Sequence, residues 1–241
     1  MNIQQCLDRL ANGELVNTTF VCDDQISDTK VPFIISLINE ALLRLYSRFI
    51  LKEDYALIEL NELRTTYYLD SSHAYDLSVE KIPKSSKVCL ENYDKYIFAS
   101  KDRPFTNNVI KILRVCDSSG NELPLNNSSN PLSVFTPTYN SIQIANLDID
   151  GALAVTYQAK HPEVTIDNLE MNLELPESFY GAFFAYIANL AYSSLQTELA
   201  MASAQKYFSI YTALLDELVT YDLGNSSYSQ TNTKFYKNGW C

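Results

Sequence analysis

The spacing of apolar residues changes twice along this chain, and that change restricts the possible folds more than any other feature of the sequence. Between residues 29 and 51, apolar side chains recur every three or four positions, which is typical of one face of a helix. They are Ile34, Ile38, Ala41, Leu42, Leu45 and Phe49. The helical spacing is lost after Glu53 and returns at Pro176. Helices on both sides of a different middle region predict an α+β protein, because a parallel α/β sheet would alternate helices and strands throughout.

The middle region has the composition of strands and turns. Short runs of β-branched and aromatic residues are separated by Asn, Asp, Ser and Pro. Leu153, Val155, Tyr157 and Ala159 alternate with smaller or polar residues, which indicates a half-buried strand. The predicted strands cover residues 56–60, 65–69, 95–99, 109–116, 141–145 and 152–159. We therefore expect an antiparallel β domain.

Two helices are predicted after Pro176, with a break at Ser193-Ser194. The second helix carries a seam of residues three and four apart, which we expect to pack on the helix at 34–49. The seam consists of Ala204, Phe208, Tyr211, Leu215 and Leu218. A further short helix is expected at residues 3–10, ended by a left-handed residue at Asn12-Gly13.

These elements predict a helical bundle formed by the N- and C-terminal helices, with an inserted antiparallel β domain and a flexible C-terminal arm. The expected boundaries are 1–52 for the N-terminal helical part, 53–174 for the β domain, 175–221 for C-terminal helices packing on 30–52, and 222–241 for the arm.

The charge balance excludes most nucleic-acid-binding classes. The chain has 18 basic and 29 acidic residues, a formal net charge of -11, so it lacks the basic surface that grips phosphates. DNA that slides past without sticking is compatible with such a surface. No apolar run is long enough to span a bilayer, so we expect no membrane partner. The five cysteines lie far apart without a C-x-x-C pair, and we expect free thiols.

The motifs of common enzymes are missing. No nucleophile elbow, phosphate loop, dinucleotide turn or H-E-x-x-H pair occurs. We therefore expect no enzymatic activity, no cofactor, and no binding of metal or nucleotide. Asp148-Ile149-Asp150-Gly151 resembles the start of a calcium loop, but the remaining ligands do not follow, and a plain turn is the favoured interpretation. His161 and His73 are expected to be turn residues.

The end of the chain is the candidate binding segment. Residues 224–232 are mainly Gly, Ser, Asn, Gln, Thr and Tyr, and the only tryptophan is the penultimate residue. Such an arm leaves aromatic area in water unless a partner covers it. The candidate partner-binding residues are Lys234, Phe235, Tyr236, Lys237 and Trp240. Seventeen tyrosines favour either further association surfaces or strands; Tyr67, Tyr68, Tyr75, Tyr93 and Tyr96 are examples for which both remain open.

The order of the elements resembles a known family. The segment 38–49 resembles the first helix of head-to-tail adaptor proteins of short-tailed bacteriophages, also called tail tubular or head completion proteins. Residues 109–115, followed by a polar turn with Gly120, are similar to the strand that opens the central hairpin of their β domain. The same order continues through residues 153–162, 173–177, 187–188 and 207–218.

The resemblance implies a structural virion protein at the head-tail junction, made in the host cytoplasm. Identical subunits, usually twelve, would form a homo-oligomeric ring beneath the portal protein. The β domains would point to the tail nozzle protein, and double-stranded DNA would pass through the conduit without specific binding. Two alternatives stay open. The first is a glycan-degrading tail component that uses a pair of carboxylates; Glu59, Glu62, Asp70 and Asp76 are candidates, but no single one of them is indicated by its surroundings. The second is a component that binds a glycan or a peptide.

Overall fold

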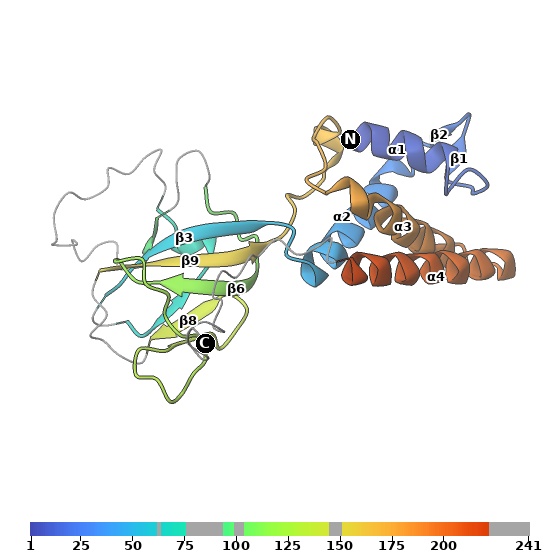
Figure 1. Cartoon of the computed structure of the whole chain (residues 1–241). Coiled ribbons are helices and arrows are strands. Elements are labelled where there is room, and N and C mark those ends of the chain that lie inside the picture. The colour runs from blue at the N-terminus through green and yellow to red at the C-terminus, as the bar shows by residue number, and fades with distance from the viewer. Residues whose placement is uncertain (62–63, 76–93, 99–103, 145–150, 222–241) are drawn as a thin grey trace, which may run out of the picture. The chain divides into compact units, whose positions relative to one another are not determined.

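The computed structural model describes residues 1–61, 64–75, 94–98, 104–144 and 151–221 (Figure 1). The described residues combine helices with antiparallel sheets, as expected for the α+β class. They form two compact units. The helical unit contains Met1–Leu51 and the described residues from His161 onward, and the β unit contains Lys52–Lys160.

The central helix of the helical unit is apolar on nearly all sides. The four helices are α1 (Ile3–Asn12), α2 (Val31–Arg48), α3 (Tyr180–Ser194) and α4 (Glu198–Thr220). α3 buries Ala182, Phe183, Phe184, Ala185, Ile187, Ala188 and Ala191. It packs against both α2 and α4, and the Arg9 guanidinium of α1 lies 4.1 Å from the ring centroid of Phe184. The prediction that the α4 seam packs on α2 is therefore wrong, because a helix that is apolar all round occupies the middle of the unit.

Local capping explains where α1 begins and ends. Asn2 and Gln5 form a reciprocal capping box that satisfies the first backbone N–H groups. The helix continues to Asn12, two residues beyond the predicted end. Gly13 follows with φ -118°, so the left-handed conformation that we predicted is absent. The need for glycine is steric, since a Cβ atom there would lie 2.9 Å from the Arg9 carbonyl oxygen.

Residues 161–174 belong with the helices, although the sequence placed them in the β domain. The Asn39 side chain of α2 pairs with both the N–H and the C=O of Val164, at 2.9 and 2.8 Å. Backbone bonds of 3.0 Å join Ile3 N to Met171 O, and Leu173 N to Met1 O. The boundary lies at Lys160 because this irregular segment finds its hydrogen-bond partners on α1 and α2.

His161 fastens the end of that segment. Its Nδ1 lies 2.6 Å from the Pro162 carbonyl oxygen, and its Nε2 accepts a 3.0 Å bond from the Glu174 N–H. The Tyr46 hydroxyl of α2 donates to the carbonyl oxygen of Glu174. Since Nε2 accepts, the proton sits on Nδ1 and the ring is neutral. His161 is hydrogen-bonded at both ring nitrogens, but it lies in an irregular segment rather than in the turn that we predicted.

The described residues of the β unit form two antiparallel sheets. The four-stranded sheet has the order β5 (Ile97–Phe98), β3 (Glu53–Glu59), β9 (Ala152–Ala159), β6 (Val109–Cys116). The three-stranded sheet has the order β4 (Thr66–Tyr68), β8 (Ser141–Ile144), β7 (Val134–Phe135). β3 and β9 pair without interruption from Glu53 opposite Gln158 to Glu59 opposite Ala152. The two ends of the unit are thus adjacent, and Ala159 N donates to Lys52 O at 2.9 Å.

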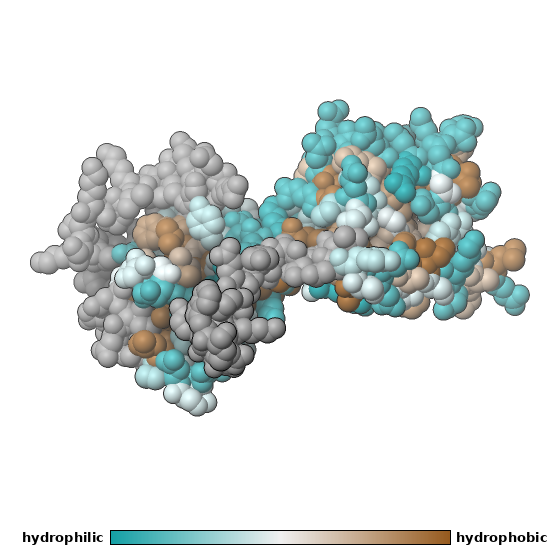
Figure 2. Space-filling view, in the orientation of Figure 1, coloured by the Kyte–Doolittle hydropathy of each residue, from teal (hydrophilic) through white to brown (hydrophobic). Residues whose placement is uncertain are grey.

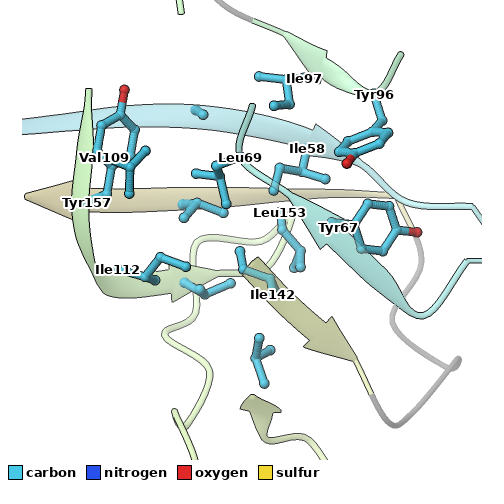
Figure 3. Packing of buried hydrophobic residues seen from close by; sticks show 14 of the residues in the cluster. Ile58, Tyr67, Leu69, Tyr96, Ile97, Val109, Ile112, Ile142, Leu153 and Tyr157 are labelled. Atoms are coloured by element: carbon cyan, nitrogen blue, oxygen red, sulfur yellow. The ribbon is translucent and has the colours of Figure 1, made fainter. Parts of the chain in front are cut away.

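Alternating residues of both sheets share one core. The predicted alternation in β9 is confirmed, because Leu153, Val155, Tyr157 and Ala159 are all buried. Figure 3 shows side chains from β3, β6, β8 and β9 meeting there, among them Ile58, Ile112 and Ile142.

Two of the tyrosines singled out from the sequence, Tyr67 and Tyr96, belong to this core. Tyr75 is buried as well, whereas Tyr68 is exposed; Tyr93 lies outside the described residues. The Tyr67 hydroxyl accepts from Asn61 N at 2.7 Å, and the Tyr96 hydroxyl accepts from Tyr68 N at 2.8 Å. Tyr67 and Tyr96 thus contribute apolar area to the core while their hydroxyls remain satisfied.

A tight hairpin after α1 was not predicted from the sequence. It joins β1 (Val21–Cys22) to β2 (Gln25–Ile26) through Asp23 and Asp24. Both aspartates have positive φ, 51° and 61°, a conformation that two-residue hairpin loops require but that glycine adopts more readily. The signal was weak because Asp-Asp replaces the usual Asn-Gly or Asp-Gly.

Replacing Asp24 by glycine should therefore stabilise the protein. We expect Asp24→Gly to raise the free energy of unfolding by about 0.5–1 kcal/mol, since glycine relieves the left-handed strain. Urea unfolding measures the change. Asp24→Ala is the matched control: it removes the same charge without the conformational freedom, so equal stabilisation by alanine would show that charge, not strain, is responsible.

Candidate interaction surface

The arm residues singled out by the sequence, Lys234 to Lys237 and Trp240, lie outside the described residues. The prediction that they bind a partner therefore stays a prediction. A candidate surface within the described residues comes instead from α4, the last helix before the arm.

The sequence around residue 196 sets the direction of α4. Gln196 has a positive φ of 53° and reverses the chain after α3. The Thr197 hydroxyl then accepts from Ala200 N and caps α4. The two helices come close together at Gly181, where a Cβ atom would lie 3.2 Å from Leu214 Cδ1.

The packed side of α4 agrees with most of the predicted seam. Ala204, Tyr211, Leu215 and Leu218 are buried, and α4 packs on α3. Phe208, which we also assigned to the seam, is 41% exposed. The seam residues Tyr211 and Ala204 meet Tyr186 and Asn189 of α3, and Phe208 lies at the margin of that contact.

Large apolar side chains remain exposed along the rest of α4. Six residues of the helix and its C-cap are between 38% and 84% exposed: Leu199, Met201, Phe208, Ile210, Val219 and Tyr221. Figure 2 shows brown, hydrophobic residues over α4 on the face in view. We call these six residues the α4 apolar rows.

The rows lie on opposite flanks of the exposed face of α4. Leu199, Ile210 and Tyr221 are eleven residues apart, about three helical turns, so they share one side. Met201, Phe208 and Val219 share the other side. The exposed face between them carries the small residues Ala202, Ser209 and Ala213 together with Gln205, Lys206, Asp216 and Thr220. The small residues at its centre leave room for another helix to pack there.

Exposed apolar side chains in this number favour association with another surface. Fully burying one large apolar side chain is worth roughly 1.5–3 kcal/mol, so covering the exposed part of each of these would stabilise a complex by roughly 0.5–2.5 kcal/mol. Nothing on the apolar rows offers a nucleophile or an acid-base pair.

The polar candidates from the sequence have structural roles where they are described. The Asp70 carboxylate accepts from Ser72 N at 2.8 Å, and that hydrogen bond lowers the pKa of the carboxyl. His73 Nδ1 lies 2.7 Å from the Asp94 carbonyl oxygen, and its ring stacks on Tyr96. Glu62, Asp76, Asp148 and Asp150 lie outside the described residues. The described part of the chain has no group of three side chains that could hold a metal ion.

Comparisons with known proteins identify no relative. No family model matches the chain, and no curated protein matches it. Among the described helices, none is both long and apolar enough to cross a membrane.

Five of the six residues of the α4 apolar rows were not predicted from the sequence. Their signal was present, since positions 199, 210 and 221 are apolar at a spacing that cannot belong to the seam of Tyr211 and Leu215. A helix with apolar residues on more than one face has either several neighbours in its own chain or a partner outside it.

Proposed function

We propose that this protein is a structural virion protein, the subunit of an adaptor ring that connects the portal of a short-tailed bacteriophage to the tail nozzle and lines the DNA conduit. The observation that carries the proposal is the exposed pair of apolar rows on α4, which calls for a helical neighbour. A ring of identical subunits, for which the resemblance implies twelve copies, supplies such neighbours to every copy.

The proposal assigns different tasks to the two units. The helical unit is the bundle that forms the ring and meets the portal, and the β unit is an inserted domain that seats the nozzle. The adjacent ends of the β unit at Lys52 and Ala159 support the insertion, since a domain can be inserted where its ends lie close together. The net charge of -11 suits a conduit wall that does not hold DNA.

The direct experiment mixes the purified chain with the portal protein of the same phage and measures complex formation. A saturable complex with one ring of this chain on each portal supports the proposal. An absence of binding, or hydrolysis of capsular or cell-wall glycans by the chain, would refute it.

The C-terminal arm gives a second expected result. Within the adaptor, Phe235, Tyr236 and Trp240 anchor the arm on the portal or on a neighbouring subunit, with Lys234 and Lys237 as rim contacts. Burying three aromatic side chains offsets the several kcal/mol lost in ordering a short arm. Deletion of residues 224–241 should leave the subunit folded but abolish stable attachment to portals in a pull-down.

Trp240→Ala is the sharper variant, since it removes one anchor and leaves the length of the arm unchanged. We expect it to weaken attachment by roughly one to two orders of magnitude, as removal of a central aromatic contact typically does. Lys234→Ala should have a much smaller effect. Truncated chains that join portals as tightly as the full chain would contradict this anchoring role of the arm.

A further inference from the structure

The exposed face of α2 differs from that of α4 in shape and in charge. Ser36, Glu40, Leu43 and Ser47 follow one another along the outer side of α2 at spacings of four, three and four. Leu43 is 50% exposed. Beside it, Arg44 and Arg48 lie one turn apart, and both are exposed. This α2 face therefore presents one apolar knob next to two cations.

The outer side of α4 carries the opposite charge. Asp216 and Glu217 are exposed near its C-terminal end, close in sequence to Val219 and Tyr221. Within the described residues, neither these two acids nor Arg44 and Arg48 form an ion pair. With Glu40 one turn before Arg44, this part of the α2 face carries a net charge of +1 (two cations and one acid), and the C-terminal part of α4 carries the two negative charges of Asp216 and Glu217.

The small number of basic residues limits which surface of another copy the acidic end of α4 can contact. In the described residues of the helical unit there are fourteen Asp and Glu side chains and five Lys and Arg side chains. The five cations are Arg9, Lys30, Arg44, Arg48 and Lys206. Arg9 lies 4.1 Å from the Phe184 ring centroid, Arg48 lies farther, 5.8 Å from the Phe49 ring centroid, and Lys206 lies on α4 itself. The α2 face is the place where two exposed cations stand together, so elsewhere the acidic surfaces of two copies would mostly repel each other.

We propose that α4 of one copy packs on α2 of the next, with Leu43 seated on the exposed face of α4 at Ser209 and Ala213 and with Arg44 and Arg48 facing Asp216 and Glu217. The inference rests on the proposed function and names the contact between neighbouring subunits. Because the two faces are different surfaces, the contact is head-to-tail, and it closes into a ring when the rotation between copies divides a full turn. The small residues at positions 202, 209 and 213 allow the second helix to approach closely.

Charge reversal of the full chain tests this contact. Arg44→Glu with Arg48→Glu, and separately Asp216→Arg with Glu217→Arg, should each weaken self-association at least about tenfold, because like charges then face each other across the contact. Sedimentation of the purified chain at increasing concentration measures it. Circular dichroism confirms that each variant stays helical.

The mixture of the two double variants provides the matched control. In a head-to-tail contact, a reversed α2 meets a reversed α4, and the remaining contacts are native, so the mixture should assemble like the wild type. A single chain with all four reversals should assemble as well. Should a double variant unfold, Ala213→Gln adds bulk at the centre of the exposed face of α4 and should weaken association without changing charge.

Three results would overturn the inference: reversal of the α2 pair that leaves association unchanged, a mixture that stays dissociated, or a wild-type chain that stays monomeric at its highest soluble concentration. An unchanged α2 variant would indicate that α4 pairs with another α4. The adaptor function is measured separately by portal binding. A ring on the portal whose neighbours do not join α2 to α4 would refute this contact and leave the adaptor function standing.

Discussion

A chain in which Leu51 is joined to His161 through a short linker is expected to fold into the helical unit alone, with a cooperative thermal transition and the helical circular dichroism of α1 to α4. The chain leaves and re-enters the β unit at adjacent strand ends, where Ala159 N donates to Lys52 O. Loss of the β unit therefore leaves a gap that a few residues can close. An unfolded product would contradict the inserted-domain architecture.

The boundary in this experiment matters as much as the excision. Joining Leu51 to Pro176, the boundary taken from the sequence, also removes the buried side chains of Val164, Leu173 and Leu175. It removes His161 and the partners of Asn39 and Tyr46 as well. From the apolar burial and the hydrogen bonds we expect this shorter chain to lose on the order of 5 kcal/mol of stability relative to the chain joined at His161. Equal stability of the two shortened chains would show that residues 161–174 do not support the helices.

Alkaline pH is expected to destabilise the protein through Cys6. Burial in the helical unit, opposed by Arg9 and assisted by Glu14, raises the pKa of this thiol from 9.0 to about 12. Since the folded pKa lies above the unfolded one, the contribution is complete below pH 9 and is lost as the pH rises towards 12. At 1.36 kcal/mol per pH unit, the loss amounts to about 4 kcal/mol.

Cys6→Ala isolates this contribution. The variant should lose about 1 kcal/mol at neutral pH, where a small cavity forms, but its stability should fall less steeply between pH 9 and 12. Cys22→Ala, at an exposed cysteine, should follow the wild-type curve. Unfolding by urea at each pH measures the difference, and parallel curves for wild type and Cys6→Ala would contradict a protonated buried thiol. The raised pKa of Tyr46, also caused mainly by burial, affects all three proteins alike.

The sequence predicted those elements whose apolar spacing is regular. Val109–Cys116 and Ala152–Ala159 have the predicted bounds, and the break after Ser194 is where the helices separate. Strict alternation and helical spacing are local properties, so they can be read without knowing the rest of the fold.

Features that depend on distant partners could not be predicted. Residues 161–174 lack regular spacing, and their place is decided by single side chains such as Asn39 and Tyr46 more than one hundred residues away. The neighbours of α3 could not be predicted either, because apolar residues on nearly all of its sides do not indicate which helix packs against which side. The α4 apolar rows could be recognised only when the buried side of α4 was known, because the side chains that are exposed depend on which side of the helix packs on α3.

Imaging the complex of this chain with the portal of its own phage tests the adaptor proposal most directly. We predict a closed ring of identical copies beneath the portal, with the helical units in contact with it and the β units directed to the nozzle. Particles in which the chain is absent from the head-tail junction, or occupies it as a single monomer, would contradict the proposal.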